Sequence, residues 1–261
     1  MAVIALLSPG GSPGVTTTAL ALALAWPRDV LVAECDPAGG AVLAGMWRGQ
    51  VAGDGGGLLR FALAAQRDAQ AAGEMIRTGA LPLEDGVATR FVLPAPSGPL
   101  LARQLAAAWP AVAAGFAAAT ADVIVDAGRF DAGPVLAPVL AGAARVLLAC
   151  RPLIRLAAAA KPRLEALAAL RPGEPAAELL LVGTGPYGQD AAKVFSGTLG
   201  IPVRASLPWD PATAAVLSDG ATPRRGFGRS PLVRAATGLA AGLARDTAAL
   251  PSPSLPAGVR R

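Results

Sequence analysis

Short apolar runs alternate with longer stretches rich in alanine and leucine, and this alternation limits the possible folds more than any other feature. The apolar runs have the length of strands and cover residues 2–7, 29–34, 90–93, 122–126, 145–149, 178–182 and 202–207. The stretches between them have helical spacing and cover residues 16–25, 58–72, 100–119, 153–170, 189–199 and 231–249. Strands that are apolar on both faces and are joined by helices predict a doubly wound, mostly parallel α/β sheet flanked by helices.

The chain has 261 residues, enough to bury a substantial core in a single sheet of this kind. We predict one domain over residues 1–249 and a disordered tail, containing Pro, Ser and Arg, over residues 250–261. No apolar run approaches the roughly 20 residues that cross a bilayer. The segment from Met1 to Leu7 has no basic residues and is too short for a secretory signal. These features predict a cytoplasmic protein.

The composition excludes several classes of site. The chain has no histidine, which excludes a Ser-His-Asp triad and metal sites built on histidine. Its two cysteines, Cys35 and Cys150, cannot form a structural zinc site alone, and they fit a reducing compartment better than a disulfide framework. Arginine outnumbers lysine 21 to 2 beside abundant alanine, a bias typical of a GC-rich genome such as that of an actinobacterium.

A glycine-rich loop joins the first apolar run to the first helix. Residues 8–18 read Ser-Pro-Gly-Gly-Ser-Pro-Gly-Val-Thr-Thr-Thr, and Val15 stands where the phosphate-loop pattern G-x-x-x-x-G-K-[ST] has its lysine. Backbone N–H groups in such a loop, together with the helix N-terminus, can bind an anion without a side-chain charge. We therefore expect nucleotide binding to survive and fast hydrolysis to be lost. The alternative is an ordinary Gly/Pro turn. The expected phosphate-binding residues are Gly10, Gly11, Ser12, Pro13, Gly14, Val15, Thr16 and Thr17.

Two carboxylates follow apolar runs further along the chain. Asp36 stands two residues after the run that ends at Glu34, and Asp126 ends the run that starts at Asp122. Ligands of parallel sheets bind beyond the carboxyl ends of the strands, so both carboxylates are expected beside the glycine-rich loop. Each of them, taken alone, also fits a helix cap or a turn.

The order of these motifs is similar to that of the ParA/MinD family of P-loop ATPases, which have a deviant Walker A loop. The similarity covers roughly residues 2–249 and includes Glu-Cys-Asp-Pro at 34–37, Asp-Val-Ile-Val-Asp at 122–126 and Ser-Leu-Pro-Trp-Asp at 206–210. It implies ATP and Mg²⁺ as cofactors and a nucleotide-dependent homodimer. It also implies a role for individual residues: Thr16, Asp36 and Asp126 at the metal, Asp36 as the catalytic residue that positions the attacking water, and Pro208 and Asp210 at the nucleotide base.

The sequence departs from that family at both of its phosphate-binding lysines. These lysines fall on Gly10 and Val15, and the family's first switch aspartate falls on Glu34. An arginine can replace a lysine at a phosphate, because guanidinium binds phosphate well. The sequence selects none of the candidates, which are Arg129, Arg151, Arg224 and Arg225.

The resemblance leads to three functional hypotheses. The first is a positioning protein that binds ATP, acts as a dimer switch with weak or slow hydrolysis, and localises pilus or secretion machinery, as TadZ-like proteins do, or partitions a chromosome or plasmid. The second is a pseudo-ATPase scaffold that has lost nucleotide binding and works through protein–protein contacts. The third is an ATPase rescued by an arginine.

Positive charge is concentrated towards the end of the chain. Residues 222–261 hold seven arginines and one acid, Asp246, whereas the first 221 residues hold 16 basic and 17 acidic residues. Such a segment can contact nucleic acid or an anionic membrane, as relatives in this family do, or it can be a solvated tail.

Overall fold

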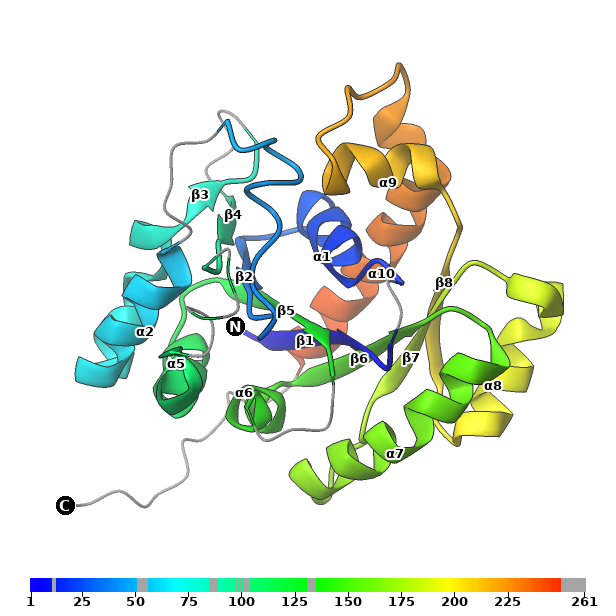
Figure 1. Ribbon diagram of the computed structural model, residues 1–261, viewed down its shortest axis with the longest axis horizontal. Coiled ribbons are helices and arrows are strands. Elements are labelled where there is room, and N and C mark those ends of the chain that lie inside the picture. The colour runs from blue at the N-terminus through cyan, green and yellow to red at the C-terminus, as the bar shows by residue number, and fades with distance from the viewer. Residues whose placement is uncertain are drawn as a thin grey trace.

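The computed structural model describes residues 1–10, 13–50, 56–84, 89–96, 98, 100, 104–130 and 135–249, and an eight-stranded sheet runs through its centre (Figure 1). The strand order is β3-β4-β2-β5-β1-β6-β7-β8. Only β3 is antiparallel to its neighbour, and the prediction of a mostly parallel sheet is confirmed. The strands are β1 (Val3–Ser8), β2 (Val30–Glu34), β3 (Leu81–Pro82), β4 (Arg90–Leu93), β5 (Asp122–Arg129), β6 (Arg145–Cys150), β7 (Glu178–Val182) and β8 (Val203–Leu207).

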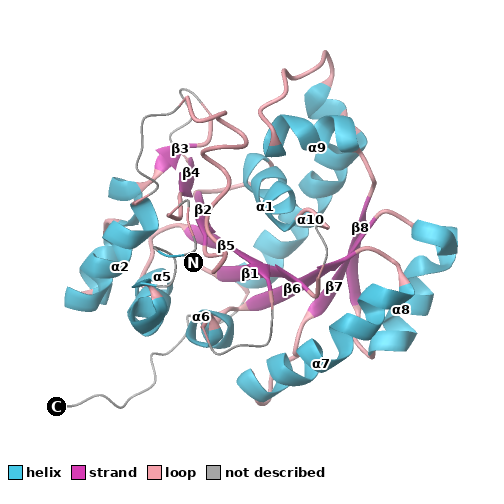
Figure 2. Ribbon diagram, in the orientation of Figure 1, coloured by secondary structure: helices cyan, strands magenta, loops and turns pink. Residues whose placement is uncertain are grey.

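Helices cover both faces of this sheet (Figure 2). One face packs against α1 (Val15–Leu24), α9 (Pro211–Ser218) and α10 (Pro231–Ala248). The other face packs against α2 (Gly57–Arg67), α3 (Ala69–Glu74), α5 (Trp109–Ala117), α6 (Ala137–Gly142), α7 (Ile154–Leu170) and α8 (Ala191–Leu199). Short 3₁₀ turns lie at Ile76–Gly79, Ala106–Ala108, Gly185–Asp190 and Phe227–Arg229.

The alternation along β1 shows why the strands are apolar throughout. Ile4 and Leu6 belong to the core beneath α1 and α10, whereas Val3, Ala5 and Leu7 belong to the core on the opposite face, and all five are buried. Successive side chains of a strand point to opposite faces, so a sheet covered on both sides needs apolar residues at every position. The apolar runs in the sequence therefore report burial on both faces.

Several elements differ from the sequence-based expectations. The predicted helix at 58–72 is two helices, because Asp68 is extended and caps α3 by accepting a hydrogen bond from the Ala71 N–H at 3.0 Å. The expected helix at 100–119 corresponds to α5 and the 3₁₀ turn before it, and residues 101–103 lie outside the described residues. β5 runs three residues beyond its predicted end, to Arg129. The sequence reading missed β3, α6 and α9, which are two, six and eight residues long.

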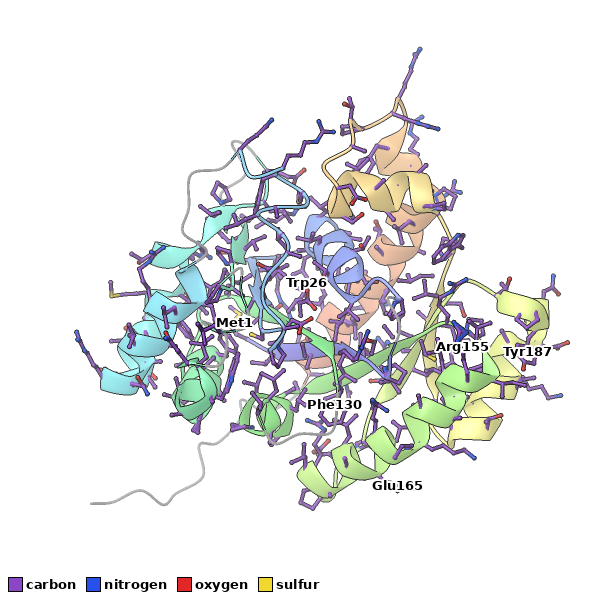
Figure 3. All side chains as sticks on the ribbon, viewed as in Figure 1. Met1, Trp26, Phe130, Arg155, Glu165 and Tyr187 are labelled. Carbon is purple, nitrogen blue, oxygen red and sulfur yellow. The ribbon has the colours of Figure 1, made fainter. Side chains whose placement is uncertain are left out.

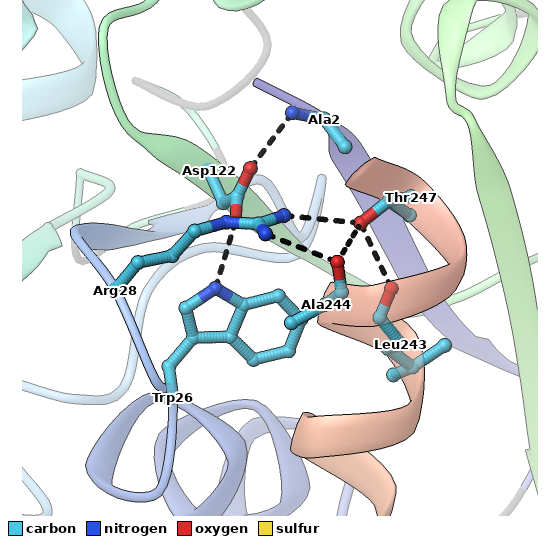
Figure 4. A network of polar contacts seen from close by, with 7 residues as sticks. All are labelled: Ala2, Trp26, Arg28, Asp122, Leu243, Ala244 and Thr247. Carbon is cyan, nitrogen blue, oxygen red and sulfur yellow. Dashed lines mark hydrogen bonds and ion pairs between the residues drawn. The ribbon is translucent and has the colours of Figure 1, made fainter. Parts of the chain in front are cut away.

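A polar network holds the amino-terminal edge of the sheet together. Asp122, the fully buried first residue of β5, accepts hydrogen bonds from the Ala2 N–H at 2.8 Å and the Trp26 indole N–H at 2.9 Å, and it pairs with Arg28 (Figure 4). Arg28 also donates to the Ala244 carbonyl oxygen of α10. The side chain of Trp26 is buried in the interior of the protein (Figure 3). By contrast, Glu165 on α7, outside this network, is exposed to solvent. The network joins β1, β5, α10 and the segment after α1.

Among the described residues, none of the helices combines the length and the apolar character needed to cross a membrane. The predicted tail over residues 250–261 lies outside the described residues, so its disorder stays a prediction.

Candidate functional site

A large cavity lies at the carboxyl-terminal edge of the sheet. It has a volume of about 950 Å³, within the range of about 300–1,000 Å³ that is usual for ligand sites. Its walls come from the first turn of α1, the segment after β2, the end of β5 and the connection from β8 to α9. The predicted residues at 13–17, Asp36, Pro208 and Asp210 all line this cavity. Gly11 and Ser12 lie outside the described residues, and Gly10 does not line the cavity.

The first turn of α1 presents its backbone to the cavity. Gly14 precedes the helix in a left-handed conformation, with φ 88° and ψ 43°, which suits glycine. The first helical hydrogen bond runs from the Thr18 N–H to the Gly14 carbonyl oxygen at 2.8 Å. Within the described residues no side chain caps this helix and its first turn holds no acid. The turn thus offers N–H groups and the positive end of the helix dipole to an anion.

Val15 occupies the position of the missing lysine. Its side chain is 6% exposed and packs into the apolar core beneath α1, although the residue also lines the cavity. Its apolar side chain brings no positive charge to the phosphate-binding end of the cavity. Charge compensation must therefore come from another side chain or from a bound cation.

Asp126 and Thr16 are in direct contact. The Thr16 hydroxyl donates a hydrogen bond to the Asp126 carboxylate, which also accepts one from the Gly128 N–H at 3.1 Å. Burial raises the pKa of Asp126 to about 7, and the charges of Glu34 and Asp36 add to this rise against the two hydrogen bonds. A buried carboxylate next to a hydroxyl is an arrangement that a divalent cation would stabilise in its charged form.

Asp36 lies against the turn at the end of β5. Its carboxylate accepts a hydrogen bond from the Ala38 N–H at 2.8 Å. Gly128 has φ 59°, and a Cβ added there would lie 2.0 Å from the Asp36 Oδ2 atom. Only glycine allows this approach, and the approach brings the segment after β2 to the end of β5.

Glu34 holds the segment that follows Asp36. Its carboxylate accepts three backbone hydrogen bonds, from the N–H groups of Ala41 and Val42 at 2.9 Å each and of Ala95 at 3.1 Å. The side chain is buried, and desolvation raises its pKa despite these hydrogen bonds. Glu34 is therefore a structural anchor between the segment after β2 and the end of β4. The sequence reading noted Glu34 only as a departure from the family pattern and missed this role.

The charge of the cavity wall is unfavourable for a bare phosphate chain. Among the described lining residues Arg129 is the one cationic side chain, against the three carboxylates of Asp36, Asp210 and Asp219. Of the arginines considered as replacements for the lysine, Arg129 alone lines the cavity. Arg151 lies instead with its guanidinium carbon 4.4 Å from the ring centroid of Trp209, which lines the cavity and is 55% exposed. The sequence analysis placed the segment 208–210 near the nucleotide base but assigned no role to Trp209, although a tryptophan between Pro208 and Asp210 was a usable signal.

Asp210 has a local structural role in addition to its place in the cavity wall. It caps α9 by accepting hydrogen bonds from the Thr213 N–H at 3.2 Å and hydroxyl at 2.7 Å, and it accepts a longer one from the Leu232 N–H at 3.4 Å. Burial works to raise the pKa of Asp210, but these hydrogen bonds outweigh it and the pKa is lowered. The contact of Pro208 and Asp210 with a nucleotide base stays a prediction.

The oxygen atoms of the site suit magnesium, which takes few ligands from the protein, better than a metal ion whose ligands all come from the protein. No group of three or more Asp, Glu, Cys or His side chains is arranged to hold a metal ion in the part of the chain that the structure describes. Magnesium in phosphate-transfer sites usually takes one or two protein oxygens and completes its shell with phosphate and water. Thr16, Asp126 and Asp36 supply oxygens of that kind. The two cysteines are buried free thiols, and burial raises the pKa of Cys150 to about 12.

Comparison with known proteins shows which solved structures share this fold. No family model matches the sequence, and no curated protein is similar to it in sequence. Among solved structures, the ParA family ATPase from Chlorobium tepidum is 15% identical, with a TM-score of 0.70 over 92% of this chain and 98% of the other. The septum site-determining protein MinD from Pyrococcus horikoshii, a complex with Mg-ADP, is 14% identical, with a TM-score of 0.68 over 94% and 97%.

A biosynthetic enzyme shares the same architecture. Cobyrinic acid a,c-diamide synthase from Mycobacterium smegmatis, with a bound ATP analogue and magnesium, is 16% identical, with a TM-score of 0.66 over 97% of this chain and 100% of the other. The chain therefore has the fold of ParA- and MinD-type P-loop ATPases. Because one fold carries several functions, the function must be argued from the site.

Proposed function

We propose that this protein binds ATP with Mg²⁺ in the cavity at the carboxyl edge of the sheet and acts as a positioning protein, a nucleotide-dependent dimer switch with weak or slow hydrolysis. One observation carries the proposal: Thr16 and Asp36 line the cavity at the uncapped first turn of α1, and Asp126, which is buried and does not line it, accepts the hydrogen bond of the Thr16 hydroxyl. The fold supports it, since structural neighbours include Mg-ADP and ATP-analogue complexes. The site residues assigned from the sequence remain part of this proposal.

In this proposal each group has a defined task. The N–H groups of the first turn of α1 hold the phosphates, and Arg129 supplies the one positive side chain of the described wall. Thr16 and Asp126 hold the magnesium ion, which neutralises phosphate charge when bound. Asp36 orients water. Loss of the lysine removes stabilisation of transition-state charge, so turnover is slow while binding persists. Slow turnover suits a switch, whose output is the population of two states.

The cellular role that we propose is spatial. A ParA/MinD-like switch would recruit a protein partner, either pilus or secretion machinery, as TadZ-like proteins do, or partition machinery. The basic C-terminal region is our candidate for contact with DNA or an anionic membrane, because Arg224, Arg225, Arg229, Arg234 and Arg245 are all exposed. Both contacts would weaken as salt increases.

Calorimetric titration with ATP and Mg²⁺ tests the proposal. We expect saturable binding to the wild-type protein and a loss of at least about tenfold in affinity for Thr16→Ala, which removes the hydroxyl beside Asp126. Thr237→Ala is the matched control, because Thr237 lies on the exposed side of α10 and its hydroxyl bonds only to the Val233 carbonyl oxygen. Equal affinity for Thr16→Ala and the wild type would remove the proposed site.

A pseudo-ATPase scaffold is the second candidate, and the charge of the cavity wall favours it. Three carboxylates face one guanidinium in the described lining, so the wall repels a triphosphate unless a cation accompanies it. Absence of binding at millimolar nucleotide with Mg²⁺ would establish the scaffold and exclude the switch. Turnover that survives both Thr16→Ala and Asp36→Ala would come from a contaminant or another site.

A further inference from the structure

A second cavity lies at the opposite edge of the sheet. It has a volume of about 540 Å³ and is lined by residues 1–3, by residues 141–145 between α6 and β6, and by Thr247 and Ala248 at the end of α10. Its lining shares no residue with that of the first cavity. Nothing proposed for the nucleotide site uses it.

The charge of this cavity is the reverse of that of the first. Its described lining holds three arginines, Arg28, Arg145 and Arg171, and one acid, Glu174, which is exposed. Cavities of this size are usual for small ligands. An excess of guanidinium groups in a recess raises the local concentration of anions.

Two of the three arginines have structural partners. Arg28 pairs with the buried Asp122 and donates to the Ala244 carbonyl oxygen (Figure 4). Arg171 donates through Nη1 to the carbonyl oxygens of Leu140 and Ala143, at 2.8 and 2.5 Å. These carbonyl groups lie at the ends of α10 and α6, where the helix dipole is negative. Arg28 and Arg171 thus already satisfy the carbonyl oxygens at these helix ends. These contacts do not account for the third arginine, Arg145.

Arg145 lacks such partners. Its Nε atom is buried and has no hydrogen-bond partner among the described residues. Its ion pair with Glu178 is 3.7 Å long, beyond hydrogen-bond distance, and Glu178 is shared with Arg204 at the same distance. Because this buried Nε atom is the nitrogen that faces Glu178, the Nη donors of Arg145 are the ones that a ligand in the cavity would contact.

Two other arginines provide a comparison for Arg145. Arg77 and Arg90 also have a buried Nε atom without a partner. Each of them, however, pairs through another nitrogen with a carboxylate at hydrogen-bond distance, Arg90 with Glu84 at 2.6 Å and Arg77 with Asp29. At Arg145 the buried Nε atom is itself the nitrogen of the 3.7 Å pair, and no carboxylate of the described residues lies at hydrogen-bond distance from this guanidinium.

Arg145 also affects its neighbour Arg171. Burial lowers the pKa of Arg171, and the positive charge of Arg145 lowers it further, against the opposing effect of Glu174. Two guanidinium groups that repel each other in a partly desolvated recess would both be stabilised by one anion between them.

We propose that this second cavity binds a small multivalent oxyanion, with Arg145 as the main contact and Arg171 beside it. The planar donors of guanidinium match the oxygens of phosphate and of carboxylate, which are the two possible sources of the charge. The site does not depend on the nucleotide-binding function proposed above, because it shares no residue with that cavity.

Amide chemical shifts followed during a titration with pyrophosphate, and separately with citrate, test this site. We expect saturable shifts at Ala2, Ala144 and Ala248, which line the second cavity. Shifts at 14–17 report the first cavity in the same experiment. A stronger response to pyrophosphate assigns the site to phosphate ligands, and a stronger response to citrate assigns it to carboxylates. No saturable shift at Ala2, Ala144 and Ala248 with either probe at millimolar concentration would overturn the proposal.

Substitution of Arg145 makes the test specific. We expect Arg145→Gln to weaken the response at Ala2 and Ala144 about tenfold and Arg145→Lys, which keeps the charge, to weaken it less. Arg155→Gln is the matched control, because Arg155 is exposed on α7 at the other end of β6 (Figure 3), and it should leave the response unchanged. Equal affinities for the wild type and both Arg145 variants would overturn the proposal. If Arg145→Gln fails to fold, the wild type and Arg145→Lys decide.

Discussion

At the scale of single residues, the candidate site depends on positions that carry no charge. Gly128 admits the Asp36 carboxylate where a Cβ would lie 2.0 Å from Oδ2, and Gly14 takes the left-handed conformation that starts α1. Sequence reasoning predicted Asp36 and Asp126 from their places at the ends of apolar runs and Thr16 from its place in the glycine-rich loop. It could not identify the role of Gly128, because the contact joins two segments that are 92 residues apart and depends on tertiary structure.

Gly128→Ala should displace Asp36 and weaken binding of ATP with Mg²⁺, because the added methyl group would overlap the carboxylate and φ would stay strained at 59°. We expect a loss of at least about tenfold in calorimetric affinity. Gly238→Ala is the matched control: it lies within α10 with no atom within 4 Å of the added Cβ, and it should stabilise the fold by about 0.5–1 kcal/mol. Unchanged affinity in Gly128→Ala would show that Asp36 does not contribute to the site.

Asp126 predicts a pH dependence of stability. Its pKa is raised from the ordinary 3.8 to about 7 in the folded protein, so between these values the native state keeps a proton that the unfolded state releases. The stability that this group contributes is complete below its unfolded pKa and is lost as the pH rises through about 7. Asp126→Asn is neutral throughout, so its melting temperature should gain on the wild type between about pH 4 and about pH 7. Asp190→Asn, on the exposed turn before α8, is the control. If the melting temperature of Asp126→Asn rises relative to the wild type by no more than that of Asp190→Asn, the prediction is contradicted.

At the scale of elements, β5 carries a structural carboxylate at one end and, near the other, the carboxylate that we propose to bind the metal. Asp122 starts the strand inside the network of Figure 4, and Asp126 meets Thr16 near its end. The sequence predicted this strand and its neighbours because both faces of the sheet are buried. The sequence analysis missed α9 because that helix is short. The helix starts at Pro211 after its cap Asp210, and the sequence analysis interpreted Asp210 as a nucleotide-binding residue and not as a helix cap.

The network around Asp122 predicts a large loss of stability. Asp122→Ala would leave the Trp26 indole N–H and the Ala2 N–H without their acceptor and Arg28 without its acid. We expect the free energy of unfolding in urea to fall by about 3 kcal/mol or more. Asp68→Ala removes only the cap of α3 and should cost about 1 kcal/mol. A cost for Asp122→Ala no greater than that of Asp68→Ala would show that the network adds little.

At the scale of the whole molecule, the two edges of the sheet have cavities of opposite charge. The described wall at the carboxyl edge holds three carboxylates and one arginine, whereas that at the amino edge holds three arginines and one acid. The sequence placed the excess of positive charge near the end of the chain, but it could not reveal the difference in charge between the two cavities. Arg28, Arg145 and Arg171 come together only when β1, β6 and α7 are in place.

The charge of the carboxyl-edge cavity predicts that nucleotide binding requires a divalent cation. We expect ATP to bind with Mg²⁺ and to lose most of its affinity when EDTA replaces the metal, since Arg129 is the one cation in the described wall. Light scattering in the same two conditions should show dimer only with Mg²⁺ and nucleotide. ATP affinity that is equal with and without Mg²⁺ would mean that Arg129 or another group replaces the lysine fully.

The central claim is that main-chain N–H groups, the Thr16 hydroxyl and a bound cation can hold a triphosphate in a loop whose lysine position is Val15. A crystal structure with Mg²⁺ and a non-hydrolysable ATP analogue measures this directly. The account predicts phosphates at the first turn of α1 and magnesium about 2.0–2.1 Å from the Thr16 hydroxyl oxygen. A cavity without nucleotide under saturating analogue, or phosphates bound away from α1, would contradict it.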